Sequence, residues 1–488
     1  MLPPMSATVE LRTTRRTRTA GLRLDAWTVR PCTVLDRAGV KEGQPFILGA
    51  DGSYDVHLNR FLRELDSWGV TADNSIESYS RDVMLFCRFL SESRNGKTIW
   101  ECDSEDLRAY KRVRLFSGLD SVSVGTWNRS IAALDKWVAW ALYEELLTKE
   151  PFRYADKTVM THDGPRTMRV NAEHVAGPED EPVRFVSFED YLLWRDVGLR
   201  GELPEGGRDP RWRGRNGERN AMFADLIVYT GMRLSEASSL LVPEIPPLVT
   251  GRRITGDVHL SKAVTKRNKA RTVFMTLRML RSLHHFIDIE RDELVTRRLA
   301  EGAYARGDSA VLVRRAGRHA LTLGTGRGWS YAKIGPAERR RLARVCPDGS
   351  AGEPLWLWLG EDGQPLSPST WQSAFRRANE RCAKFGIDLA ISPHTLRHLY
   401  AVHMLGLLLR QTIRALGRRD DQRLARAELR RLLIGNPMRK LQQLLGHTHE
   451  STVYIYLDLL DEAQEIVLAA MAEWDAQAAV LDRVEVAA

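Results

Sequence analysis

The chain has 488 residues and a mass of 55.4 kDa, enough for about two to four domains that each bury a core of their own. Hydrophobic residues make up 43% and charged residues 28%, and no apolar run reaches the roughly 18 to 20 residues of a membrane-spanning helix. This composition excludes a disordered tail and an integral membrane protein.

The charge balance favours a polyanionic partner. Lys and Arg number 72 against 63 Asp and Glu, which gives a net charge of +9 and a pI near 9.4. The basic start lacks the apolar stretch of a secretory signal, so we expect a cytoplasmic protein. The cysteines are far apart and form no CxxC pair, so we expect neither disulfides nor a structural zinc. They are Cys32, Cys87, Cys102, Cys346 and Cys382.

The N-terminal third divides into an arm and a helical domain. Residues 1–54 are irregular, with early Thr-Arg alternation, and predict a basic N-terminal arm that either contacts DNA or is a solvated terminus. Residues 55–150 predict a compact helical domain, because apolar residues recur there at spacings of three and four. The first stripe is Tyr79, Val83, Phe86 and Leu90, and the second is Ile131, Leu134, Val138, Ala141 and Leu142.

The remaining segments predict a linker and a larger second domain. Residues 151–183 lack periodicity and contain Pro, Gly and charged residues, so we expect an interdomain linker. Residues 184–470 predict a mixed domain that opens with a helix capped by Ser187. Its stretch GRRITGDVHLSKAVTKRNKARTVFM is rich in β-branched residues around a polar turn and predicts a small antiparallel sheet. Residues 471–488 predict a C-terminal helix or tail.

Three strings contain the groups that phosphodiester transfer needs. YTGMRLSEASSL contains Arg233 and Glu236, HTLRHLYAVHML contains His394, Arg397 and His398, and LLGHTHESTVYIYLD contains His447, Tyr454 and Tyr456. Taken singly, each string also fits a surface ion pair or a structural histidine. A zinc site is not expected, because the metalloprotease helix motif has Glu next to its first histidine and this chain has Thr395 there.

In this order the strings resemble the signature of the tyrosine recombinase (phage integrase) family. That signature has an Arg in TGxRxSE, a Lys in a β-hairpin, a HxxRH box, and a Tyr nine residues after a GH pair. KRNKARTVF matches the hairpin pattern and selects Lys266, with Lys262 and Lys269 as competitors, and the spacing from His447 selects Tyr456 over Tyr454. SIESYSRDVMLFCRFL and GTWNRSIAALDKWVAW resemble helices of the family's N-terminal domain.

The resemblance implies a mainly helical fold with a small antiparallel sheet. It places a helical, SAM-like core-binding domain before a mixed α+β catalytic domain. It also implies a site-specific DNA recombinase that cuts and rejoins strands through a 3′-phosphotyrosyl intermediate, without metal, ATP or another cofactor. The implied partners are double-stranded DNA of the bacterial nucleoid and three further copies in a tetramer on DNA, with related recombinases or DNA-bending proteins as candidate accessories.

The resemblance also implies a role for each residue of the signature. Arg233 and Arg397 suit an anionic phosphate, because each guanidinium stays charged and can present two parallel donors, and His447 adds a third donor. Tyr456 is the implied nucleophile and His394 the implied general base. Lys266 would protonate the leaving 5′ oxygen, while Glu236 and His398 would support the site. Candidate DNA contacts are Lys111, Arg112, Arg129, Lys262 and Lys269.

Two tracts are longer than the family needs and predict inserts near 295–350 and 408–436. The second is basic and fits either a DNA or partner contact or a solvated helix; LGTGRG in the first fits an ordinary loop. An apolar stripe from Val467 to Leu481 predicts a helix that docks on a neighbouring subunit or on its own domain. The alternative functions are a non-catalytic DNA-binding accessory factor of the same fold and a type IB topoisomerase.

Overall fold

The computed structural model describes residues 8–14, 22–24, 27–29, 35, 37–41, 43–71, 73–116, 118, 121–161, 164–176, 186–248, 255–304, 310–417, 436–447, 453 and 456. The chain divides into two compact units, Met1–Glu181 (unit 1) and Pro182–Ala488 (unit 2). Within the ranges just given, no helix is both long and apolar enough to span a bilayer.

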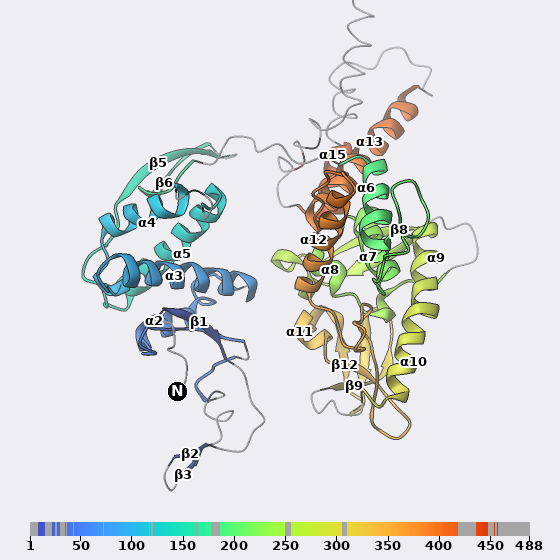
Figure 1. Ribbon diagram of the computed structural model, residues 1–488, viewed down its shortest axis with the longest axis horizontal. Coiled ribbons are helices and arrows are strands. Elements are labelled where there is room, and N and C mark those ends of the chain that lie inside the picture. The colour runs from blue at the N-terminus through green and yellow to red at the C-terminus, as the bar shows by residue number, and fades with distance from the viewer. Residues whose placement is uncertain are drawn as a thin grey trace, which may run out of the picture. The chain divides into compact units, whose positions relative to one another are not determined.

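Unit 1 is mainly helical, as predicted. Its helices are α2 (Val56–Glu64), α3 (Asp73–Ser93), the 3-10 turn η1 (Ile99–Glu101), α4 (Ser104–Phe116) and α5 (Val124–Tyr143) (Figure 1). Ser123 caps the N-terminus of α5, because its side chain accepts a hydrogen bond from the backbone N–H of Thr126. Phe86 and Leu90 of α3 and Leu134 of α5 are fully buried, so both predicted apolar stripes face the core of the unit.

Part of the expected N-terminal arm belongs to this core. Strand β1 (Glu10–Thr13) pairs antiparallel with β4 (Pro45–Leu48), and β2 (Leu22–Leu24) pairs with β3 (Trp27–Val29). Ile47 is buried, and its backbone exchanges two hydrogen bonds with Asn59 of α2, at 2.7 and 2.9 Å. The prediction of an irregular N-terminal arm was therefore wrong for residues 8–14 and 43–48. Between them, the structure describes only short fragments.

The expected linker is also largely ordered. Strands β5 (Tyr154–Thr161) and β6 (Gly164–Asn171) form an antiparallel hairpin. The hairpin is tied to α5, because Asp135 accepts hydrogen bonds from the Tyr154 hydroxyl at 2.9 Å and from the Asn171 amide at 2.7 Å. An irregular linker was the wrong prediction for Tyr154–Asn171, since most side chains of this hairpin are polar and give no apolar alternation.

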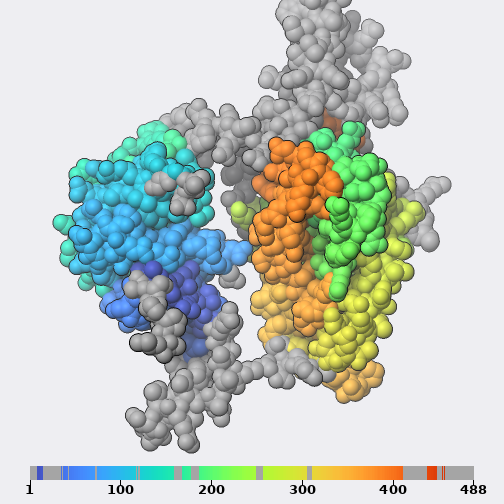
Figure 2. Space-filling view, viewed as in Figure 1, coloured from blue at the N-terminus to red at the C-terminus, as the bar shows by residue number. Residues whose placement is uncertain are grey.

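Unit 2 is also mainly helical. Its α-helices are α6 (Phe188–Trp194), α7 (Gly217–Thr230), α8 (Leu234–Ser238), α9 (Leu277–His285), α10 (Asp292–Ala300), α11 (Pro336–Arg339), α12 (Pro368–Lys384), α13 (Pro393–Gly417) and α15 (Asn436–Leu445). Its other helical segments are η3 (Arg195–Arg200), η4 (Val242–Glu244), η5 (Lys262–Val264), η6 (Lys266–Asn268), η7 (Phe286–Arg291) and η8 (Tyr331–Lys333). Helix α12 packs along α6 and η3, as Figure 2 shows in orange and green.

An aromatic cluster lies within the core of unit 2. Phe223 of α7 stacks on Trp371 of α12 with ring centroids 3.7 Å apart, and Trp358 packs edge-on against both rings. All three side chains are buried, and stacked and edge-on aromatic pairs add to the free energy of folding beyond the area they bury. This cluster fixes α7, and the turn that follows it, against α12.

Unit 2 contains two sheets. Strands β7 (Thr255–Leu260) and β8 (Arg271–Thr276) form the predicted antiparallel hairpin. The tract expected as an insert near 295–350 contains most of a second, five-stranded sheet, in the order β11-β10-β9-β12-β13. Its strands are β9 (Val311–Ala316), β10 (Ala320–Leu323), β11 (Gly328–Ser330), β12 (Leu342–Val345) and β13 (Ala351–Pro354). LGTGRG connects β10 to β11, and this sheet lies at the end of unit 2 remote from α13 and α15 (Figure 1).

The last third of unit 2 is described in part. Helix α13 includes the first residues of the tract expected as an insert at 408–436, and α15 begins at its last residue. Residues 418–435, Tyr454 and the predicted C-terminal helix lie outside the described residues. Helix α13 packs against both α7 and α15, and α15 also contacts β8. These contacts bring the predicted catalytic strings together.

Candidate active site

The turn after α7 places Arg233. Helix α7 ends at Gly231, whose φ of +63° is a left-handed conformation that glycine adopts without strain. A Cβ at this position would lie 2.3 Å from the ring of Tyr400 on α13. The glycine thus lets α13 approach the turn closely. Arg233 then caps α8, and its backbone N–H donates to Glu236 at 2.7 Å.

Glu236 forms ion pairs with two arginines, Arg233 and Arg271. Its fully buried carboxylate accepts from the Arg233 guanidinium at 3.1 Å and from Arg271 at 2.7 and 2.6 Å. Burial would raise the pKa of Glu236, but the hydrogen bonds and charges of Arg271 and Arg233 lower it below its ordinary value. Glu236 therefore remains ionised, and its hydrogen bonds hold the Arg233 guanidinium in place.

Arg271 is a site residue that the sequence did not single out. It is the first residue of β8, and its side chain is 8% exposed. Besides Glu236, it donates to the Leu444 carbonyl of α15 at 3.1 Å. Arg271 thus connects the hairpin, α8 and α15. Arg271 is the last residue of the string KRNKAR, from which only Lys266 was selected as a site residue.

Arg397 is buried at the centre of the site. Its guanidinium donates to the Gly231 carbonyl in the turn after α7 and to the Leu445 carbonyl at the end of α15. Burial and the nearby charge of Arg233 lower its pKa to about 9. A guanidinium with this pKa stays protonated at neutral pH, so Arg397 is a buried cation.

Two of the three predicted histidines, His398 and His447, lie next to Tyr456, and the third, His394, packs on His398. On α13 the rings of His394 and His398 lie 4.2 Å apart, as their i, i+4 spacing predicts. His398 Nδ1 lies 3.0 Å from the Tyr456 hydroxyl, and the ring of His447 lies 6.5 Å from that of Tyr456. His447 Nδ1 is buried without a hydrogen-bond partner among the described residues. The hydrogen-bond partner of Tyr456 is therefore His398, although the sequence suggested His394 as the base.

Burial and cations keep these histidines neutral. The pKa of His447 falls to about 4, first through burial and then through the charges of Arg397 and Arg233. The pKa of His394 is lowered by partial desolvation, by the same two arginines and by Lys266. Burial raises the pKa of the Tyr456 hydroxyl, a rise that the two arginines oppose. Tyr456 therefore needs a proton acceptor to become a nucleophile at neutral pH.

The β7–β8 connection presents the three candidate lysines. All three are exposed, and Asn268 at the tip has a φ of +53°. Lys266 is the one whose charge acts on His394. The choice of Lys266 over Lys262 and Lys269 stays a prediction from the KRNKARTVF pattern.

The other candidate DNA contacts are in unit 1, where two of them are already paired. Lys111 lies 3.0 Å from Glu173, and Arg129 lies 2.8 Å from the buried Asp82. Arg112 is exposed on α4. Arg112 is therefore the more available of these three cations for a phosphate.

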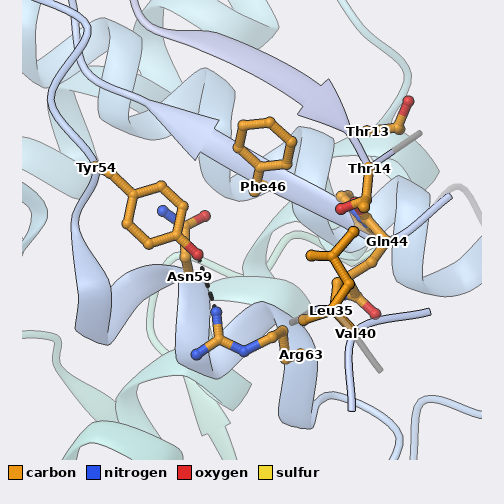
Figure 3. A pocket seen from close by; sticks show the side chains of 10 residues that line it. Thr13, Thr14, Leu35, Val40, Gln44, Phe46, Tyr54, Asn59 and Arg63 are labelled. Carbon is orange, nitrogen blue, oxygen red and sulfur yellow. Dashed lines mark hydrogen bonds between the residues drawn. The ribbon is translucent and has the colours of Figure 1, made fainter. Parts of the chain in front are cut away.

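The described side chains of this cluster form no metal site, and a cavity is found in the other unit. In the described part of the chain, no three His, Cys, Asp or Glu side chains are placed to hold a metal ion together. A cavity of about 360 Å³ lies in unit 1 between β1, β4 and α2, where Arg63 donates to the Tyr54 hydroxyl at 2.9 Å (Figure 3). This cavity belongs to a different unit from the predicted catalytic residues.

Both units are similar to known proteins. Residues 213–407 match the "Phage integrase family", and residues 58–145 match the "Phage integrase, N-terminal SAM-like domain". Tyrosine recombinase XerC of Roseiflexus sp. is 23% identical over 402 residues, which cover 82% of this chain and 88% of the relative. Tyrosine recombinase XerD of Corynebacterium glutamicum is 30% identical over 131 residues, 27% of this chain and 33% of the relative.

Among solved structures, the Tn1549 transposon integrase in complex with a circular intermediate DNA is similar with a TM-score of 0.45 and 13% identity, covering 82% of this chain and 94% of that one. The two family matches together span more than half of the chain, and the first includes the TGMRLSE turn, the lysine hairpin and the HTLRH box. The chain belongs to the phage integrase, or tyrosine recombinase, family of site-specific DNA recombinases.

Proposed function

We propose that the protein recombines double-stranded DNA by forming a covalent 3′-phosphotyrosyl link through Tyr456. The observation that carries this proposal is the convergence of one tyrosine hydroxyl, two arginines and three histidines from separate segments of unit 2. This set contains a nucleophile, cationic donors for phosphate oxygens and proton acceptors, all of which phosphodiester transfer requires.

Each group has a step in the reaction. Arg233 and Arg397 bind the non-bridging oxygens, whose negative charge grows as phosphorus becomes five-coordinate. His447 can add a donor if its unpartnered Nδ1 carries the proton. The Tyr456 oxygen bonds to phosphorus while the bond to the 5′ oxygen breaks, and Lys266 gives that oxygen a proton. The phosphotyrosyl link conserves bond energy, so the reverse reaction with a new 5′ end joins strands without ATP.

We further propose that the protein acts as a tetramer on DNA in the cytoplasm, where it associates with the nucleoid. Exchange between two duplex sites requires four strand cleavages, hence four tyrosines. The net charge of +9 favours a polyanionic partner, and exposed Arg112, Lys262 and Lys269 are candidate phosphate contacts.

Covalent trapping tests this function. The protein is incubated in EDTA with nicked DNA carrying its native site and then denatured, and a protein–DNA adduct is sought. We expect an adduct from the wild type and from Tyr454→Phe, and none from Tyr456→Phe. Loss in Tyr454→Phe alone would identify the other tyrosine as the nucleophile. No adduct on a site that the protein binds would favour a non-catalytic DNA-binding factor.

A further inference from the structure

The hydroxyl of the predicted nucleophile is hydrogen-bonded to His398, and not to His394, the histidine expected to be the general base. Tyr456 is 2% exposed, and its hydroxyl lies 3.0 Å from His398 Nδ1. The rings of the two residues have centroids 5.6 Å apart. His394, one turn earlier on α13, contacts His398 instead. The proton of Tyr456 thus has an acceptor within direct reach.

The surroundings keep His398 unprotonated until an anion arrives. His398 is faced by His394 and Arg397 on its own helix, by Tyr456, and by His447 after α15. Burial, followed by His394 and Arg397, lowers the pKa of His398 to about 4. A phosphodiester bound to Arg397 would offset this positive charge, so the proton affinity of His398 rises when the substrate binds.

We propose that His398 is the catalytic base that takes the proton of Tyr456 during cleavage and returns it during rejoining. This role rests on the proposed function. The Tyr456 oxygen bonds to phosphorus and the phosphorus–O5′ bond breaks. The tyrosine proton moves to His398 Nδ1, and a proton from Lys266 goes to the 5′ oxygen. His394 is then left to act on the phosphate. On rejoining, each proton returns along the same path.

A rival role for the same hydrogen bond predicts the opposite sign. If His398 only holds Tyr456 in its buried position, removing the imidazole frees the tyrosine and cleavage accelerates. If His398 is the base, removing it slows cleavage. The sign of the change therefore separates the two roles.

The test compares His398→Asn, which retains a polar group but cannot accept the proton, with His403→Asn. His403 is exposed on the same helix and packs on Phe188, away from the tyrosine. The measurement is the single-turnover rate of adduct formation on nicked DNA, with DNA affinity measured in parallel. We expect His398→Asn to lose about 10²- to 10³-fold in rate at unchanged affinity, the usual range for a lost general base. His403→Asn should retain the wild-type rate.

A second substrate separates the base from the acid. DNA with a sulfur in place of the leaving 5′ oxygen needs no proton on the leaving group, so it should rescue Lys266→Ala but leave His398→Asn slow. The wild-type rate should also fall with decreasing pH as His398 becomes protonated, and this acidic limb should be absent in His398→Asn. This limb can be measured in the wild type even if the variant folds poorly.

Three results would overturn the proposal: an unchanged rate, a faster rate, or rescue of His398→Asn by the sulfur substrate. An adduct from the wild type combined with any of these refutes the role of His398 alone. Absence of an adduct from the wild type would instead refute the proposed function.

Discussion

Replacing Arg271 by Ala should destabilise unit 2 by about 3 to 5 kcal/mol, the usual cost of removing one partner of a buried ion pair. Arg271 donates to both oxygens of Glu236, at 2.7 and 2.6 Å, and to the Leu444 carbonyl at 3.1 Å. Without it, the fully buried Glu236 retains only Arg233, whose side chain is 24% exposed. The negative charge of this buried carboxylate would then lack most of the positive charge that now balances it.

Urea unfolding of the full chain, read by hydrogen exchange and mass spectrometry, reports on unit 2 separately from unit 1. Lys269→Ala is the matched control, because Lys269 is exposed on the same hairpin and its loss should change the free energy of unfolding by less than about 0.5 kcal/mol. A loss below about 1 kcal/mol in Arg271→Ala would refute the argument that the ion pair holds the site together.

The same pair gives a pH dependence with a defined sign. The folded-state pKa of Glu236 is lowered, so its contribution to stability is present above its unfolded-state pKa and is lost as pH falls through the folded value. The stability difference between wild type and Arg271→Ala should therefore shrink below about pH 4, the ordinary range for Glu. A difference that grows as the pH falls would show that Glu236 is not held ionised by Arg271.

Three further substitutions test the site. Gly231→Ala should lower the melting temperature more than Gly349→Ala. Both glycines have a positive φ (+63° and +83°), but only a Cβ at position 231 would clash with the ring of Tyr400. Equal effects would contradict the close packing of α13. Arg397→Lys should reduce cleavage by about 10²-fold in a single-turnover assay, since an ammonium cannot span two carbonyls and a phosphate; wild-type rates would refute this role. At saturating protein, where weaker DNA binding does not limit the rate, Lys266→Ala should slow cleavage more than Lys269→Ala, and the reverse order would show that the hairpin lysine was misassigned.

Much of the fold could be predicted from local patterns. The stripe of Val83, Phe86 and Leu90 repeats with the helical period and is buried as expected. The β5–β6 hairpin could not be recognised in the same way. Its strands are mostly polar, and their docking depends on hydrogen bonds to Asp135, which lies 19 residues before Tyr154 and 36 before Asn171. Such contacts carry no periodic signal in the sequence.

The sequence signature named the residues of the candidate site but not the hydrogen bonds among them. Spacing placed His394 and His398 on one face of a helix, yet which of them reaches Tyr456 depends on the path of the chain after α15. Arg271 stood inside a recognised pattern, but its partner Glu236 lies 35 residues earlier. A supporting side chain such as Arg271 is recognised only from the packed structure, in which it binds Glu236.

The proposed function depends on a covalent bond between Tyr456 and DNA. The most direct measurement is protease digestion of the trapped adduct, followed by mass spectrometry of the DNA-linked peptide and analysis of the DNA end. The account predicts a peptide in which Tyr456 carries a 3′-phosphate-linked nucleotide. A nucleotide on any other residue, or a link through a 5′ phosphate, would contradict it.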